Sequence, residues 1–310
     1  MDPGHRFTIF DQMRVNDIFT HLDLGLNISN MGVGFQLSSP VTEWARLRAG
    51  VDFMPHFNVP MSFDIAAYSD GQVNPENFQR IKELMNELTG FNIDEQVDMT
   101  AKPNGVNFRL MVDIMPIPSN RNWHVTVGFL AGSSQIGKVK NDMHEMSSLL
   151  TMGLYNRFYD YLASGEYIDR PIIPSMDIYL DPEEAQQLFS KLEKYGHLGM
   201  HVGNFKDTGE PYMMEPNSEG LVKAKALVNH FKPYLGVGYN GPLGKNERFK
   251  IGFDAGVLFW GGAPNVITHD GVNLTTQVTG ISGKVGDYMS LLRGMKVCPM
   301  VNFKISYTLF

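Results

Sequence analysis

Residues 231–259, FKPYLGVGYNGPLGKNERFKIGFDAGVLF, contain the clearest strand pattern of the chain. The first part of this stretch, 231–239, and its last part, 249–259, carry apolar residues at every second position, with mostly Gly, Lys or Asp between them. A side-chain period of two is that of a β-strand with one apolar and one polar face. The glycine-containing turn GPLGKNER joins the two strands as antiparallel neighbours.

The same alternation recurs along the chain and predicts eight strands. They are 22–28, 32–38, 44–53, 106–114, 123–132, 231–239, 249–259 and 297–310. Connections after the second, fourth and sixth strands are short, whereas those after the third, fifth and seventh run to tens of residues. This pattern is typical of an all-β, up-and-down antiparallel transmembrane β-barrel with both termini on the side of the short turns.

Composition narrows the class of protein. The 310 residues are 43% hydrophobic and 19% charged, and no apolar run reaches the ~20 residues of a transmembrane helix. A net charge of -7 argues against nucleic acid as a partner. The single cysteine, Cys298, excludes an intrachain disulfide, and we expect an inert buried thiol on the lumen face. A soluble all-β protein and a membrane barrel both remain open.

The bulk of the apolar face favours the membrane barrel. An eight-stranded lumen is only just wide enough for side chains, and the polar face carries most of the strand glycines. We therefore expect the phenylalanines of the apolar face to contact lipid. They are Phe35, Phe53, Phe108, Phe129, Phe231, Phe249, Phe253 and Phe259.

The charged residues of the strands then face inward. The predicted lumen charge network comprises Asp23, Arg46, Arg48, Asp52, Arg109, Asp113, His124, Lys232, Lys250, Asp254 and Lys304. Charges removed from water cost several kcal/mol each unless they are paired. We therefore expect cross-strand ion pairs that fill the lumen and leave no open diffusion pore.

Four segments resemble a known family. They are GVGFQLSSPVTEWARLRAGVDFMP, FKPYLGVGYNGP, RFKIGFDAGVLFWGGAPNV and the ending FKISYTLF. Together they resemble the Bacteroidetes-type outer-membrane β-barrel proteins, over roughly half of the chain. The resemblance implies a bacterial outer-membrane location and a C-terminal signal, here Tyr307, Leu309 and Phe310, that the barrel-assembly machinery reads. Leu309 keeps phase with Tyr307, so Phe310 is expected just beyond the strand.

The domain boundaries follow from the strand pattern. Residues 1–18 are expected to be a periplasmic segment and 19–310 the barrel, with extracellular insertions at about 57–104, 135–229 and 262–295. No export signal stands at the start of the sequence, so for an outer-membrane protein we expect that it has been removed.

Helical periodicity occurs inside the first two insertions. One helix is predicted after the N-cap Asn74, with Phe78, Ile81, Leu84, Met85 and Leu88 on its apolar stripe. A second lies within 141–163, and a third follows the N-cap Asp181 and Pro182 and ends before Gly196.

No catalytic or cofactor motif is recognisable. His144 and Glu145 lack the second histidine of H-E-x-x-H, and His197 and His201 stand in a segment that alternates like a strand. We predict no enzyme activity, no cofactor and no metal. If the chain were an enzyme, its groups would come from the barrel rim. The rim candidates are Asp94, Asp98, Ser133, Ser134, His144, His197 and His201.

The sequence favours a structural or interaction protein in the outer membrane. Its partners would be outer-membrane lipid, the assembly machinery, and a protein or glycan bound by a helical surface cap. The alternatives are a narrow channel or hydrophobic-solute transporter, an outer-membrane enzyme with a rim active site, and a soluble lipocalin-like carrier. The pattern leaves a strand count of eight or ten open.

Overall fold

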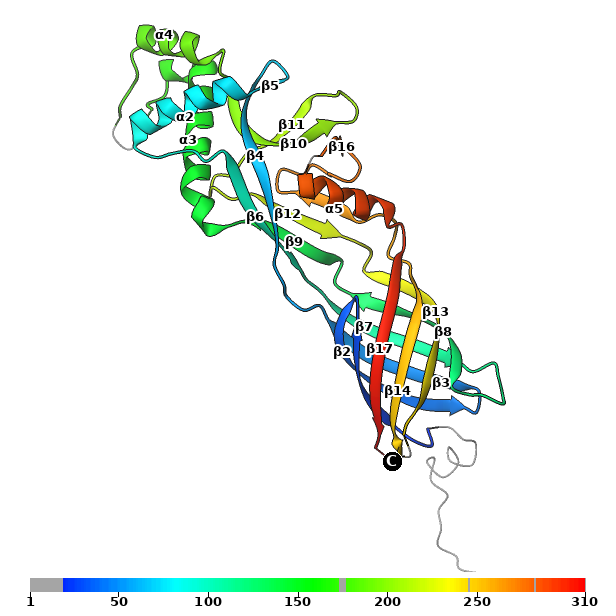
Figure 1. The fold of residues 1–310 in the computed structure, drawn as a ribbon. Helices are drawn as coiled ribbons and strands as arrows, with labels where there is room; N and C mark the ends of the chain where they lie inside the picture. Colours follow the sequence, from blue (N-terminus) through cyan, green and yellow to red (C-terminus); the bar gives the residue numbers. More distant parts are fainter. Residues whose placement is uncertain (1–18, 173–176, 245, 282, 310) are drawn as a thin grey trace, which may run out of the picture.

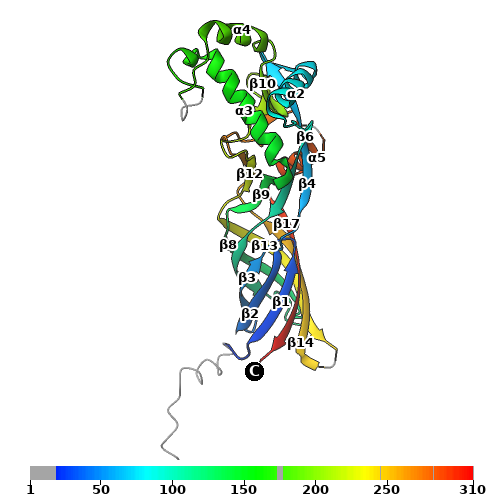
Figure 2. The same ribbon diagram turned by 90° about the vertical axis from the view of Figure 1, so that its left-hand side faces the viewer.

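The molecule is elongated, with a barrel at one end and a second sheet covered by helices at the other (Figure 1). The computed structural model describes residues 19–172, 177–244, 246–281 and 283–309. The predicted periplasmic segment 1–18 lies outside the described residues. The C-terminal strand ends at the free end of the barrel, away from the helices (Figure 2).

Eight antiparallel strands close the barrel, which confirms the predicted fold class and the strand count of eight rather than ten. Their order around the barrel is β1-β17-β14-β13-β8-β7-β3-β2. The strands are β1 (Asp23–Ser29), β2 (Gly32–Thr42), β3 (Ala45–Phe53), β7 (Val106–Ile114), β8 (Trp123–Gly132), β13 (Phe231–Leu243), β14 (Asn246–Leu258) and β17 (Cys298–Thr308). Closure comes from the pairing of the first and last strands, in which Asp23 lies opposite Thr308. Because the sheet closes on itself, the barrel has no free edge.

Apolar side chains cover the outside of the barrel on every strand. Exposed examples are Leu24, Leu26, Ile28, Phe35, Leu37, Phe53, Phe108, Val127, Leu235, Val237, Ile251, Phe303 and Ile305. Of the eight phenylalanines predicted to face outward, only Phe129 is half-buried, and its ring lies 4.9 Å from that of Phe231. A closed belt of this kind is far larger than the apolar patches of soluble monomers.

Aromatic side chains concentrate at the two ends of this belt. At the free end, the Trp123 ring lies 5.4 Å from Tyr239, and Phe249 lies 4.9 Å from Tyr307. At the opposite end, exposed phenylalanines stand at the last residue of β3, the first of β13 and just after β14. Two such girdles flank the apolar band of outer-membrane barrels.

A second sheet, of which only the strand-like segment around His197 and His201 was predicted, forms the centre of the region beyond the barrel. Its main path is β11-β10-β4-β6-β9-β12-β15; β5 and β16 lie off this path and pair with β4 and β10 respectively. The strands are β4 (Val59–Ser69), β5 (Gln72–Asn74), β6 (Gln96–Pro103), β9 (Gln135–Asn141), β10 (His197–Phe205), β11 (Pro211–Met214), β12 (Lys223–Leu227), β15 (Asn265–Thr268) and β16 (Val278–Thr279). We call this sheet and the helices on it the cap. The predicted helical cap thus also contains a nine-stranded sheet.

The rest of this sheet was not predicted because most cap strands are short or lack a regular alternation. The burial of β10 is nearly continuous, because α3 packs on this strand. The alternation around His197 and His201 nevertheless predicted a strand here, whereas strands as short as β5, β11, β12, β15 and β16 carry too few residues for a period of two to be recognised.

The helices of the first two insertions begin where the sequence predicts. Helix α2 (Pro75–Thr89) has Asn74 as its N-cap, and α4 (Pro182–Leu192) has Asp181, each accepting two backbone N–H bonds. Helix α3 (Met146–Ala163) follows the short 3₁₀ turn Met143–Glu145. On α2 the stripe is buried at Phe78, Ile81 and Met85, but Leu88 in its last turn is exposed, contrary to the predicted pattern.

The cap has a conventional apolar core. Buried members include Ile81, Met99, Leu149, Met152 and Leu198, drawn from α2, α3 and the sheet. A further helix, α5 (Gly283–Gly294), lies across the sheet just before β17 (Figure 1) and buries Val285 and Met289. Among the described residues, no helix combines the length and apolar character needed to cross a membrane.

Candidate functional site

The middle of the barrel lumen holds a compact group of buried charges. The Arg48 guanidinium donates to Asp113 at 2.7 Å and to Asp254 at 2.9 Å. Asp254 also accepts from Lys304 at 3.2 Å, and its Oδ1 lies 2.8 Å from His124 Nε2. Since all five side chains are almost inaccessible to water, their mutual pairing offsets the cost of burial.

Two further groups extend the network along the lumen. Arg109 donates to Asp52 at 3.1 Å and to Asn27 at 2.6 Å, and Asn27 in turn donates to Asp52 at 2.8 Å. At the free end of the barrel, Lys250 pairs with Asp23 at 2.9 Å. The neutral Asn27 was not among the predicted residues, although its inward phase with Asp23 was visible in the sequence.

Two predicted members differ from the rest. Lys232 is fully buried, but its ammonium donates to Asn107 at 2.9 Å and to the Ser133 carbonyl at 3.0 Å rather than to a carboxylate. Arg46 is half-buried and, within the described ranges, makes no ion pair. It stands near the start of β3, where the lumen opens at its free end, so water can hydrate it.

An apolar cluster closes the other end of the lumen, beneath the cap. It consists of Met31, Met111, Leu130, Tyr234, Leu258, Trp260, Cys298 and Met300. Cys298 is a buried free thiol, as expected for a residue on the lumen face. This plug could not be foreseen from the sequence, because its members are scattered inward positions on five strands and their connections.

Three side chains in the lumen have the donor atoms of a metal site, although their surroundings do not favour a metal ion. Asp113, His124 and Asp254 place one ligand atom each within 4.8 Å of the others. Arg48 and Lys304 already supply positive charge to these carboxylates. The trio is therefore neutralised by protein cations, and we assign it a packing role.

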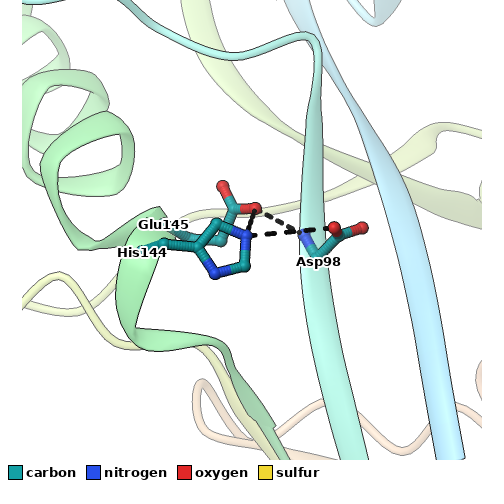
Figure 3. Close-up of side chains that lie close together, drawn as sticks. All are labelled: Asp98, His144 and Glu145. Carbon is teal, nitrogen blue, oxygen red and sulfur yellow. Dashed lines mark hydrogen bonds and ion pairs between the residues drawn. The ribbon is translucent and has the colours of Figure 1, made fainter.

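A second trio lies in the cap, where Asp98 of β6 faces His144 and Glu145 (Figure 3). His144 Nε2 lies 3.1 Å from Glu145 Oε1 and 3.9 Å from Asp98 Oδ2. The same Glu145 oxygen accepts the Asp98 backbone N–H at 3.2 Å, and Asp98 accepts from Ser62 at 2.8 Å. Burial raises the pKa of Glu145. Carboxylates and imidazole can hold Zn²⁺, but here they tie the start of α3 to β6.

The remaining rim candidates do not form one centre. Asp94, His144 and His201 line the same open hollow of about 930 Å³, whereas His197 belongs to another group. Ser133 accepts the backbone N–H of Val106 at the barrel rim, and the Ser134 carbonyl accepts from Val228. No nucleophile therefore stands beside a base among these residues, as nucleophilic catalysis requires.

His197 lies between two acids in the cap. Its Nε2 is 2.9 Å from Asp160 of α3, and its Nδ1 is 3.3 Å from Glu215. The hydrogen bond to Glu215 raises the pKa of His197 above its ordinary value. Glu215 also accepts from the Tyr68 hydroxyl at 2.6 Å. The group joins α3 to the β4–β10 side of the sheet, and Asp160 and Glu215 had no recognisable signal in the sequence.

An apolar cavity of about 280 Å³ lies between the cap sheet and α5. It is lined from the sheet by Val59, Met61, Phe63, Met99, Ala101, Ile136, Val139, Ala224, Ala226 and Val266, and from α5 by Val285, Tyr288, Met289, Leu291 and Leu292. Leu291 and Tyr288 are exposed at its edge. A lining of this kind suits an apolar ligand.

The C-terminal residues end the barrel as the phase of the strand predicts. Leu309 follows β17 with an exposed side chain, and its N–H donates to the Leu22 carbonyl at 2.8 Å. Tyr307 packs on Phe249, on the outer face of the barrel. Phe310, the last member of the predicted assembly signal, lies outside the described residues.

Comparison with known proteins gives distant structural similarity. No family model and no curated protein matches the sequence. The chain is similar to the crystal structures of Acinetobacter baumannii CarO2 (12% identity, 93% of this chain and 98% of that one, TM-score 0.39) and CarO (13%, 93% and 97%, 0.37). It is also similar to a major outer membrane protein from Thermus thermophilus (12%, 93% and 98%, 0.29). The barrel assignment rests on strand pairing, and these similarities add no argument about activity.

Proposed function

We propose that this chain is a bacterial outer-membrane β-barrel that conducts no solute and holds its cap outside the membrane as a binding module. The observation that carries the proposal is the inverted polarity of the barrel. Its apolar belt faces outward on all eight strands, while Asp52, Asp113 and Asp254 are buried inside against cations. Lipid is the surroundings that such a belt requires.

The filled lumen supports a structural rather than a conducting barrel. Arg48 of β3 reaches across the lumen to Asp254 of β14 and also pairs with Asp113 on the neighbouring strand β7, and the apolar plug closes the end beneath the cap. The cap, which no bilayer would cover, is then the part available to a protein or glycan partner. The proposal assigns the chain no catalytic activity, since its rim candidates are dispersed.

Two measurements on the refolded full chain test this function. Folded barrels migrate faster than heated ones on detergent gels, and we expect that heat-dependent shift here. In planar bilayers we expect no steady single-channel steps. Regular conductance steps, abolished in a variant that cannot fold, would contradict the closed lumen. Solubility without detergent would contradict the membrane location.

The apolar cavity beneath α5 favours a second candidate function, the binding of a hydrophobic solute. Its lining is almost wholly apolar, and the exposed Leu291 and Tyr288 give access from outside. Ligand sites are mostly apolar cavities of this kind. Because the lumen below is filled, the cavity would hold a solute rather than pass it through the barrel.

Filling the cavity tests this candidate. Ala226 lines it from β12, so Ala226→Trp is expected to abolish the binding of a fluorescent long-chain fatty acid to the refolded protein. Leu154→Trp, at an exposed position of α3, is the matched control and should bind as the native chain does. Equal binding by both variants would exclude the cavity.

A further inference from the structure

Five lysines share one face of the cap sheet. Lys102 of β6 lies opposite Lys138 of β9, and Lys138 lies opposite Lys225 of β12. Two residues further along each strand, Lys140 of β9 lies opposite Lys223 of β12. Alternate residues of a strand point to the same side, so the five ammonium groups gather on one surface. We call it the lysine face.

The lysine face carries an excess of positive charge in a chain of net charge -7. Its residues line one open hollow of about 780 Å³, and Asp142 contributes a carboxylate to the same lining. Lys223 lies 3.8 Å from Glu219, whereas the other four lysines make no ion pair with any part of the chain that the structure describes. Like charges directly opposite each other destabilise a sheet, so this arrangement calls for an external anion.

The position of the lysine face identifies the anion. Lys102 stands four residues before Val106, an exposed apolar residue at the start of barrel strand β7, and Lys225 stands six residues before Phe231. At about 3.3 Å per residue these are at most about 13 and 20 Å of chain. Figure 2 places β9 and β12 next to the cap end of the barrel. The lysines therefore lie just above the apolar belt, on the side away from the C-terminus.

We propose that the lysine face binds net-anionic phosphate headgroups of the lipid leaflet that surrounds the barrel on the cap side. The inference rests on the proposed membrane location. The headgroup layer begins where the hydrocarbon core ends, and basic residues beside the belt attract anionic lipid. The opposite face of the same strands lines the apolar cavity, so only one side of the sheet is available to headgroups.

The experiment compares the native full chain, Lys102→Gln/Lys138→Gln/Lys225→Gln and a control, Lys82→Gln/Lys191→Gln/Lys194→Gln, which removes equal charge from α2 and the region of α4. Each is refolded into vesicles of equal parts phosphatidylcholine and phosphatidylglycerol. After mild detergent extraction, mass spectrometry gives the ratio of the two lipids that stay bound. The native chain and the control should retain phosphatidylglycerol preferentially, and the lysine-face variant should lose at least about tenfold of that preference, given about 1 kcal/mol, or fivefold, per basic residue.

The insertion of each variant is measured in parallel by its heat-dependent gel shift. Insertion with equal lipid ratios in the lysine-face variant and the control would overturn the headgroup proposal alone. Failure of the native chain to insert would overturn the proposed membrane function together with it. High salt should reduce the preference of the native chain, because screening weakens exposed charge pairs.

Discussion

The barrel and the cap are built from adjoining strands, yet they distribute polarity in opposite ways. In the barrel, Asp113 and Arg48 are buried and Phe108 is exposed, whereas in the cap Met99 and Leu198 are buried and Lys102 is exposed. Only two residues separate the end of β6 in the cap from the start of β7 in the barrel. The same alternation of polar and apolar residues thus buries the polar face in the barrel and the apolar face in the cap, on either side of a short connection. The surrounding solvent determines which face is buried.

This contrast implies different origins of stability for the two regions. The cap is stabilised by the transfer of apolar surface from water into its core. The apolar exterior of the barrel is not buried by other parts of the chain, so it gives no such stabilisation in water. The stability of the barrel interior depends on every buried charge having a partner. Substitutions of one kind should therefore affect one region and leave the other unchanged.

The largest effect is expected from Asp254→Ala in the lumen. The change leaves Arg48, Lys304 and His124 without their shared carboxylate, and breaking a buried pair costs about 3–5 kcal/mol. The temperature at which the folded gel band disappears should fall. Asp287→Ala, at an exposed site of α5, is the control. Equal midpoints for both variants would mean that the lumen is hydrated rather than held by ion pairs.

A core truncation in the cap should produce the complementary result. Leu149 of α3 is fully buried, and Leu149→Ala should destabilise the cap by about 2–5 kcal/mol. Hydrogen exchange in α3 and β10 should accelerate while the heat-dependent gel shift of the barrel stays in place. Leu154→Ala on the exposed side of the same helix is the matched control. Simultaneous loss of the gel shift would show that barrel and cap unfold as one unit.

A charge placed on the outer face of the barrel tests whether that face contacts lipid. Val237 lies on the exposed face of β13, and Val237→Arg should destabilise the inserted barrel by about 2–4 kcal/mol if that face contacts lipid near the midplane. Leu88→Arg, at an exposed apolar site of α2 in the cap, should have no comparable cost. Unfolding in lipid vesicles measures both. A harmless Val237→Arg would place the belt outside the hydrocarbon.

The barrel strands were predictable from the sequence because each has a polar face toward the lumen and an apolar face toward the outside. Asp254 and Phe253, adjacent on β14, are buried and exposed respectively, as the alternation requires. The inward position of Arg48 followed from the same alternation, but its choice of Asp113 and Asp254 did not. The first pair depends on the register between β3 and β7, and the second joins opposite sides of the barrel and depends on its closure.

The cap was only partly predictable. Its helices were signalled by local chemistry, such as the Asn74 and Asp181 caps. Of the sheet, only the strand-like segment around His197 and His201 was predicted, since most of the other strands have five residues or fewer. The lysine face could not be predicted from the sequence either, because Lys102, Lys138 and Lys225 become neighbours only through pairing across three strands.

The smallest predicted effect concerns pH and should be confined to the cap. The hydrogen bond to Glu215 raises the pKa of His197, so its contribution to stability is complete below the ordinary value of 6.5 and is lost as the pH rises through the raised value. Burial opposes ionisation of Glu215, but hydrogen bonds from His197 and Tyr68 lower its pKa, so its contribution is complete above 4.5 and is lost on acidification through the lowered value.

The pair should therefore stabilise the cap most between pH 4.5 and 6.5. Above that range, we expect hydrogen exchange to accelerate first in β10 and in the part of α3 near Asp160, while the gel shift of the barrel is unchanged. His197→Gln keeps a polar side chain that does not titrate, so its cap should lack this dependence on alkaline pH. If the variant retained the same pH dependence, another group in the cap would be responsible, and the link between α3 and the β4–β10 side of the sheet would not depend on the charge of His197.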